Sequence, residues 1–216
     1  MDNITPKERI LKKIRAGLLY KNPPRLTGID LESSVYGEMT SPLPEEFAKS
    51  FTATGGKLVF CHNKYDLIDN LADLAENYKW KNIFCWDKDL RKELDDVGFA
   101  YLSGKENLEN AEASLTTCEC LVARTGSVVT SSLKNSRSLI AVPRVHIVIA
   151  YINQVVPDIK DAVKFLSNRY GKKQPSAITF ITGPSRTADI EMQLVQGVHG
   201  PEELYVFLVN IKNNKP

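Results

Sequence analysis

The stretch Lys57-Leu-Val-Phe-Cys61 opens the part of the chain that decides the fold, because its β-type residues predict a strand. A helix is predicted directly after it, since apolar residues recur at helical spacing: Leu67, Ile68, Leu71, Leu74 and Ala75. Residues 82–86 predict the next strand, and a further helix carries Leu90, Leu94 and Val97. Gly98 then stands where a left-handed helix cap is expected. Strands separated by helices of this length predict a parallel sheet covered on both faces.

Toward the C-terminus the sequence first becomes richer in β-type residues. Short runs joined by turn residues predict strands over residues 120–123, 128–131, 139–142 and 145–151. A helix is predicted over residues 157–170, with Gly171 as its stop. The remaining pattern predicts a strand over 177–182, a helix from about Thr187 and a strand over 204–209. The predicted fold class is α/β, with a mixed, largely parallel sheet flanked by helices.

The N-terminal part predicts one helix followed by an extended arm. Thr5-Pro-Lys-Glu8 is typical of a helix start, because Thr5 and Glu8 can form a capping box and proline suits the first helical position. Apolar residues then repeat at helical spacing: Ile10, Leu11, Ile14 and Leu18. Residues from 20 to about 44 are rich in Pro, Gly and Ser and show no period. We therefore expect a helix and arm over residues 1–44 and an α/β domain over residues 45–216.

The charge balance argues against several classes of protein. The 216 residues include 28 basic and 26 acidic side chains, and a net charge of +2 gives no overall electrostatic footprint for nucleic acid or an anionic membrane. No apolar run approaches the ~18 residues of a membrane span, and the N-terminus lacks the apolar core of a secretory signal. We therefore expect a cytoplasmic protein with no nucleic-acid partner and no membrane span.

The cysteines and histidines predict no metal and no bound cofactor. Cys118 and Cys120 form a lone C-x-C, and the closely spaced Cys-x-x-Cys repeats typical of iron–sulfur sites do not occur. The three histidines are scattered without spaced partners. The chain contains neither a Walker loop nor a dinucleotide-binding fingerprint.

One segment near the C-terminus combines a strand end with several polar side chains. In Ile181-Thr-Gly-Pro-Ser-Arg-Thr-Ala-Asp-Ile-Glu191 an apolar strand runs into Gly183-Pro184, and a helix is predicted to open near Ser185 or Thr187. Free amides at such a helix start attract anions, and Arg186 suits a carboxylate or phosphate. The alternative is that Ser185 and Thr187 are helix caps and that Asp189 only favours the first turn.

Two further polar segments carry candidate binding residues. In Thr125-Gly126-Ser127 the glycine lets backbone amides approach an anion while two hydroxyls point at it, although a tight turn between strands needs glycine as well. Arg137 lies between Ser136 and Ser138, and a guanidinium among hydroxyls suits the carboxylate of an α-hydroxy acid. A solvated loop arginine is the alternative.

The histidines offer weaker candidates. His146 lies near the start of a strand that is apolar on both faces, so it is either a buried histidine bonded to backbone or a proton acceptor at the strand end. His199 lies in a Gly-Val-His-Gly-Pro turn, which suits either a plain turn or a ligand-binding loop. His146, Asp189 and Glu191 are the candidates for a catalytic role.

Several of these motifs together resemble the lactate-utilisation (LUD) domain family, especially its protein C type. Most of the resemblance lies in a terminal pair of motifs, Gly183-Pro-Ser-Arg-Thr-Ala-Asp-Ile-Glu191 and Gly197-Val-His-Gly-Pro201. It extends back over residues 118–209 through four shorter motifs: Thr125-Gly-Ser127, Asn135-Ser-Arg-Ser138, Pro143-Arg-Val-His146 and Val155-Val-Pro-Asp158. Family members commonly have glutamate directly before the Thr-Gly pair, where this chain has Arg124. An acid or base role at that position would be lost here, whereas Arg124 would suit a carboxylate substrate.

The resemblance implies both a fold and a function. The fold would resemble that of the CoA transferase, ribose-phosphate isomerase and glucosamine-phosphate isomerase superfamily. The function would lie in a three-protein bacterial system that oxidises L-lactate to pyruvate, whose iron–sulfur subunits carry the cysteine clusters. This chain would be the subunit without clusters, binding a small carboxylate or phosphorylated ligand or organising the assembly.

Two other functions stay open, as do catalysis by the chain itself and self-association into a homo-oligomer. One is a stand-alone enzyme acting on a sugar phosphate or an acyl-CoA, and the other is a regulatory or scaffold protein in which the motifs are structural. The ligand-binding interpretations share one expectation: the glycine corners around positions 126 and 185 fold together into a single pocket.

Overall fold

The computed structural model describes residues 5–19, 36–135, 137–190 and 193–210, and the chain divides into two compact units, Met1–Glu38 and Met39–Pro216. Within the first unit lies α1 (Pro6–Leu19). The predicted capping box is confirmed, because Thr5 N donates to Glu8 Oε2 at 2.9 Å and Glu8 N donates to Thr5 Oγ1 at 3.3 Å. Ser136 and Glu191 lie outside the described residues, and only the backbone is described at Arg137 and Asp189.

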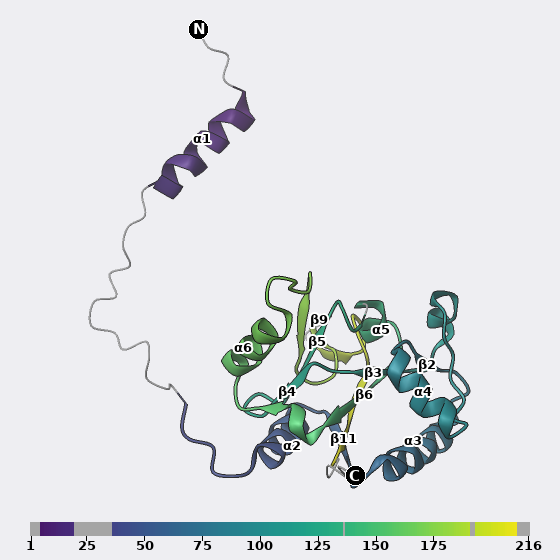
Figure 1. Cartoon of the computed structure of the whole chain (residues 1–216). Helices are drawn as coiled ribbons and strands as arrows, with labels where there is room; N and C mark the ends of the chain where they lie inside the picture. Colours follow the sequence, from purple (N-terminus) through teal and green to yellow (C-terminus); the bar gives the residue numbers. More distant parts are fainter. Residues whose placement is uncertain (1–4, 20–35, 136, 191–192, 211–216) are drawn as a thin grey trace. The chain divides into compact units, whose positions relative to one another are not determined.

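The second unit is built around a five-stranded parallel sheet (Figure 1). Its strand order is β1-β11-β6-β3-β2, and every neighbouring pair is parallel. The central strands are unbroken runs of buried residues, as expected where both faces of a sheet are covered. The predicted α/β class and parallel sheet are confirmed. The strands are β1 (Lys57–Cys61), β2 (Ile83–Cys85), β3 (Ala113–Thr117), β6 (Val145–Tyr151) and β11 (Glu203–Val209).

Two helices, α3 (Lys64–Tyr78) and α4 (Lys88–Asp96), cover one face of this sheet. Each begins at a side-chain cap that accepts two backbone amides, Asn63 for α3 and Asp87 for α4. The residue after the C-cap of α4, Gly98, has a φ of 70°, so the left-handed position expected there is confirmed. A short 3₁₀ helix, Lys105–Asn110, lies between α4 and β3.

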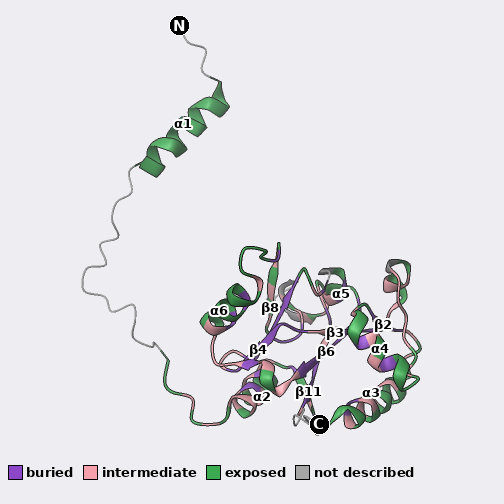
Figure 2. Ribbon diagram, in the orientation of Figure 1, coloured by how far each residue is buried: buried purple, intermediate pink, exposed green. Residues whose placement is uncertain are grey.

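A second sheet and α2 (Leu43–Ala53) cover the other face, so the predicted single mixed sheet is in fact two sheets. The second sheet has the order β7-β4-β5-β8, in which β5 is antiparallel to both neighbours. The face of the second sheet that points away from the parallel sheet packs against α6 (Ile159–Tyr170). Figure 2 shows the buried strands of the two sheets between the helices. The strands of the second sheet are β4 (Cys120–Val122), β5 (Ser127–Ser131), β7 (Val155–Val156), which follows the 3₁₀ turn Ile152–Gln154, and β8 (Ile178–Ile181).

Two predicted elements have the wrong type. Residues 139–142 belong largely to α5 (Arg137–Ala141), because a short apolar run suits one helical turn as well as a strand. The helix predicted from about Thr187 is an antiparallel hairpin of β9 (Arg186–Ile190) and β10 (Gln193–Gln196). Two long-range bonds tie its base, from Ser185 N to Pro201 O at 2.9 Å and from Gly197 N to Ser185 O at 3.1 Å.

Candidate functional site

The two glycine corners that the sequence singles out do lie together. Strands β5 and β8 pair with Val128 opposite Ile181, which brings the residues just outside that pair into contact. Ser127 Oγ lies 2.8 Å from Thr182 Oγ1 and 2.7 Å from Thr125 Oγ1, so three hydroxyls form one chain of hydrogen bonds. The expected adjacency of the corners around positions 126 and 185 is therefore confirmed, whereas the single pocket expected between them stays a prediction.

Both corners pack against the C-terminal end of α2. A Cβ on Gly126, whose φ is +60°, would collide with the backbone of Ser50 and Phe51. A Cβ on Gly183, whose φ is +79°, would collide with the carbonyl of Thr54. Arg186 Nη2 donates to the same Thr54 oxygen at 3.1 Å. These contacts favour the turn interpretation of the corner at Gly126. Near Ser185 the missing helix removes both earlier interpretations, the helix caps and the helix-start amides of an anion site.

The other predicted loop lies at the opposite end of β5. Asn135 N donates to Ser131 O at 2.9 Å, and Asn135 Nδ2 donates to Thr130 Oγ1 at 2.8 Å, so this loop is fixed where β5 ends. Ser127 and Ser131 are four residues apart along an extended strand, or about 13 Å. The structure therefore separates the loop that includes Arg137 from the paired glycine corners. His199 is exposed beside the second corner, in the turn that leads to Pro201.

His146 is fully enclosed in the parallel sheet. Its Nε2 lies 2.8 Å from Thr116 Oγ1, so it bonds to a threonine side chain rather than to the backbone expected from sequence. Among the residues that the structure describes, Nδ1 has no partner. Burial lowers the pKa of His146 to about 4, which keeps the imidazole neutral near pH 7.

The buried imidazole predicts a loss of stability in mild acid. Because the unfolded chain takes up this proton near pH 6.5 and the folded chain only near pH 4, stability falls as the pH drops through that interval. We expect His146 to account for about 2–3 kcal/mol of the stability lost between pH 7 and pH 4.5. Urea unfolding at the two pH values measures this loss, and His146→Leu should abolish that share of it. An unchanged pH dependence in the variant would contradict the assignment.

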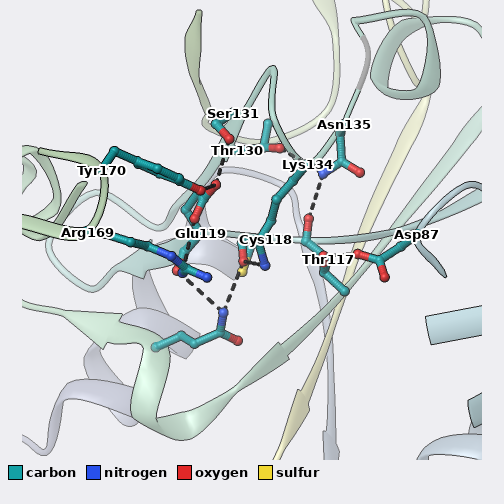
Figure 3. Close-up of polar contacts among 11 residues, drawn as sticks. Asp87, Thr117, Cys118, Glu119, Thr130, Ser131, Lys134, Asn135, Arg169 and Tyr170 are labelled. Carbon is teal, nitrogen blue, oxygen red and sulfur yellow. Dashed lines mark hydrogen bonds and ion pairs between the residues drawn. The ribbon is translucent and has the colours of Figure 1, made fainter. Parts of the chain in front are cut away.

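A second group of polar side chains gathers where β2 and β3 end, at the carboxyl edge of the parallel sheet (Figure 3). Thr117 Oγ1 donates to Asp87 Oδ2 at 2.7 Å, and Asn135 Nδ2 donates to Thr117 O at 2.8 Å. Lys134 Nζ donates to Cys118 O at 3.2 Å. This network holds the loop after β5 against two strand ends, and carboxyl edges are where open parallel sheets generally bind ligands.

Beside this network lies a cavity of about 230 Å³, here called the carboxyl-edge pocket. Aromatic and aliphatic side chains form most of its wall, and its one cation is Lys134. Asn135 also lines the pocket, and in the described part of the chain its buried Oδ1 has no donor. The lining residues are Phe84, Trp86, Leu108, Ser132, Leu133, Lys134, Asn135 and Leu139.

A buried carboxylate that the sequence analysis missed fixes the link from β3 to β4. Glu119 is fully buried, and its Oε1 accepts hydrogen bonds from Ser131 Oγ and Tyr170 Oη, both at 2.6 Å (Figure 3). Its Oε2 lies 3.2 Å from Arg169 Nη1, an ion pair without hydrogen-bond geometry. The neighbouring Cys118 carbonyl accepts from Gln154 Nε2 at 3.0 Å. Glu119 therefore holds α6 against the strands behind the pocket.

The two sides of this ion pair should respond unequally to mutation. Arg169→Met leaves a buried carboxylate with only two neutral donors, and we expect a loss of about 2 kcal/mol. Glu119→Gln keeps an acceptor for Ser131 and Tyr170 and leaves an arginine that is 43% exposed and can be hydrated, so we expect a loss of about 1 kcal/mol. Urea unfolding of both variants measures the difference, and a larger loss for Glu119→Gln would reverse the interpretation.

Arg124 forms an ion pair with Asp158. Its Nε donates to Asp158 Oδ2 at 2.9 Å, and Asp158 Oδ1 caps α6 by accepting from Ile159 N at 2.6 Å. At the position where the family resemblance led us to expect glutamate, this chain has a cation that anchors the start of a helix. The ion pair gives Arg124 a structural partner in place of the carboxylate substrate considered from sequence.

The family model of the LUD domain matches residues 76–209, which is more than half of the chain. The chain belongs to the LUD domain family. A relative named lactate utilization protein C from Bacillus subtilis is 39% identical over 113 residues, which are 50% of this chain and 47% of that protein. A relative of the same name from Halalkalibacterium halodurans is 32% identical over 155 residues, 64% of this chain and 67% of that protein. This LUD chain spans about half the length of most curated relatives it matches.

A solved structure supports the fold of this LUD chain. The crystal structure of a DUF162 family protein from Deinococcus radiodurans superposes with a TM-score of 0.59 at 20% identity, covering 77% of this chain and 96% of that one. At this identity the likeness concerns the fold alone. Within the described residues, no helix is both long and apolar enough to cross a membrane.

Proposed function

We propose that this chain acts in L-lactate utilisation as the subunit without cluster motifs and binds a small α-hydroxy acid in the carboxyl-edge pocket. The observation that supports this most directly is that Lys134 and Asn135 line one small, mostly apolar cavity, and that the Asn135 amide oxygen has no donor among the described residues. The family resemblance and the names of the relatives support lactate utilisation as the setting.

The two polar groups match the two ends of lactate. Lys134 has three N–H donors, of which one meets the Cys118 carbonyl, so the others can bind a carboxylate. The Asn135 Oδ1 can accept the hydroxyl proton of the acid, which relieves an unsatisfied acceptor that costs roughly 1–3 kcal/mol. Trp86 and Leu133 supply an apolar surface for the methyl group.

The volume of the pocket favours a small acid over an acyl-CoA. Sites for drug-sized ligands are typically about 300–1,000 Å³. A cavity of about 230 Å³ suits a three-carbon acid better than an acyl-CoA. The chain has no dinucleotide fingerprint and no cysteine cluster motif, so the proposal assigns electron transfer to the iron–sulfur subunits that the family resemblance implies.

Calorimetric titration of the purified protein with L-lactate tests the binding step. We expect Lys134→Met to weaken binding by about tenfold or more, because a charge-assisted hydrogen bond contributes about 1.5–3 kcal/mol. Lys172→Met removes an exposed lysine after α6 and should leave binding unchanged. Propionate, which lacks the hydroxyl group, should bind about tenfold more weakly than lactate.

Reconstitution with the iron–sulfur subunits tests the assembly step. Lactate oxidation should require this chain and should fall with Lys134→Met. Full oxidation without the chain would overturn the proposed role. A thermal-shift response to sugar phosphates or CoA, with none to lactate, would instead support a stand-alone enzyme.

A further inference from the structure

Helix α1 presents an apolar stripe that no described residue of its own unit covers. Ile10, Leu11, Ile14 and Leu18 are between 41% and 67% exposed, and α1 has no buried residue. With about 100° of rotation per residue, these four side chains fall within a sector of roughly 100°. Figure 2 shows the whole of α1 as exposed.

Helix α1 is strongly cationic. Five basic residues and one acidic residue give α1 a net charge of +4, whereas the whole chain carries only +2. Lys7 lies on the same side as the stripe, in the first turn, and Lys13 and Arg15 lie roughly 100° to either side of the centre of the stripe. Arg9 and Lys12 lie behind it. The net charge of the whole chain argues against an anionic surface as partner, but it does not show that one segment of the chain is strongly cationic.

We propose that α1 binds the surface of an anionic lipid bilayer and lies in the plane of the interface. A helix of 14 residues is marginal on its own in water, so it gains stability from a surface that covers its stripe. Acyl chains can receive the four apolar side chains. The flanking Lys13 and Arg15 extend along their aliphatic stems toward negatively charged headgroups.

The arrangement of the cations favours a lipid surface over a groove on another protein. A protein groove requires only the apolar stripe, and it leaves the cations of the opposite face without a role. A negatively charged plane attracts all five basic residues at once, with Lys7 and the flanking pair nearest to it. The stripe and the charge are the two signals that interfacial helices combine.

The experiment uses the full chain and sedimentation with vesicles. Vesicles of phosphatidylcholine mixed with phosphatidylglycerol should bind the protein at least about tenfold more tightly than vesicles of phosphatidylcholine alone. Raising the salt concentration should weaken this binding, because exposed charges are screened.

Two matched variants separate the stripe from the charge. Ile14→Glu and Ala16→Glu both lower the net charge of α1 by one, but only Ile14 lies on the stripe. We expect Ile14→Glu to weaken vesicle binding about tenfold more than Ala16→Glu does. Thermal unfolding of the α/β unit serves as the folding control, since neither residue is buried.

Each outcome decides the proposal. Anionic-lipid binding that depends on Ile14 supports it. Absence of vesicle binding overturns it, and so does binding that ignores lipid charge. Capture of an iron–sulfur subunit through Ile14 by a protein that fails to bind vesicles also overturns it, in favour of a protein interface. Loss of lactate binding in Lys134→Met with intact vesicle binding shows that this inference stands independently of the proposed function.

Discussion

Gly126→Ala is expected to destabilise the α/β unit by about 3–4 kcal/mol. The left-handed φ of +60° costs a non-glycine residue roughly 1–2 kcal/mol. The new methyl group would also collide with the backbone of Ser50 and Phe51 in α2, and overpacking of this kind adds about 1–3 kcal/mol. Because the colliding atoms are backbone, relief requires that α2 shift away from the β4–β5 turn.

Gly98→Ala is the matched control for this prediction. Gly98 also has a positive φ, of +70°, but a Cβ there would meet no atom within 4 Å. Its replacement should therefore cost only about 1 kcal/mol. Urea unfolding of both variants measures the difference. Equal losses would show that the turn does not pack tightly on α2.

The sequence predicts the strands β1, β6 and β11 of the parallel sheet well. Residues 204–209 are an unbroken apolar run and form most of β11. Residues 145–151 are apolar apart from His146, and they form the paired strand β6. The sequence does not reveal that β4, β5, β7 and β8 form a second sheet, separate from the parallel one. That separation depends on the pairing of Val128 with Ile181, which lie far apart in the chain and share no local pattern.

The errors at the C-terminal motif have a similar origin. Residues 186–196 carry capping residues that suit a helix, but the bond from Ser185 N to the distant Pro201 O fixes the base of a hairpin instead. The predicted arm ends at about residue 44 and no element is predicted for residues 45–56, whereas the structure has α2 over Leu43–Ala53. The spacing of Phe47 and Phe51, with Glu45 and Glu46 in the first turn, is the pattern that could have revealed α2.

The candidate site was only partly predictable for the same physical reason. The adjacency of the two glycine corners follows from motifs that the sequence shows. The hydrogen bonds that fix the loop at the carboxyl-edge pocket do not follow from a local motif. Lys134 and Asn135 bond to Cys118 and Thr117, which lie where β3 ends. Glu119, between two cysteines, gave no local indication of its bonds to α6.

Phe51→Ala is expected to lower the stability of the α/β unit by about 3–5 kcal/mol, the usual loss for a fully buried phenylalanine. Phe51 is 0% exposed, and its ring stacks on that of Phe47 with centroids 5.2 Å apart. It also fills the space that a side chain on Gly56 would occupy. For a unit of this size the loss corresponds to a fall in Tm of roughly 10 °C.

Phe60→Ala provides the control, because Phe60 is 45% exposed on the edge strand β1 and its removal should cost about 1 kcal/mol. Calorimetric unfolding of the two variants gives the comparison. The lactate titration separates stability from binding, since the carboxyl-edge pocket lies at the other end of β5 from the turn that α2 supports. Phe51→Ala should therefore retain lactate binding below its Tm. Loss of binding at temperatures where the variant is still folded would mean that the corners on α2, and not the pocket beside Lys134, hold the ligand.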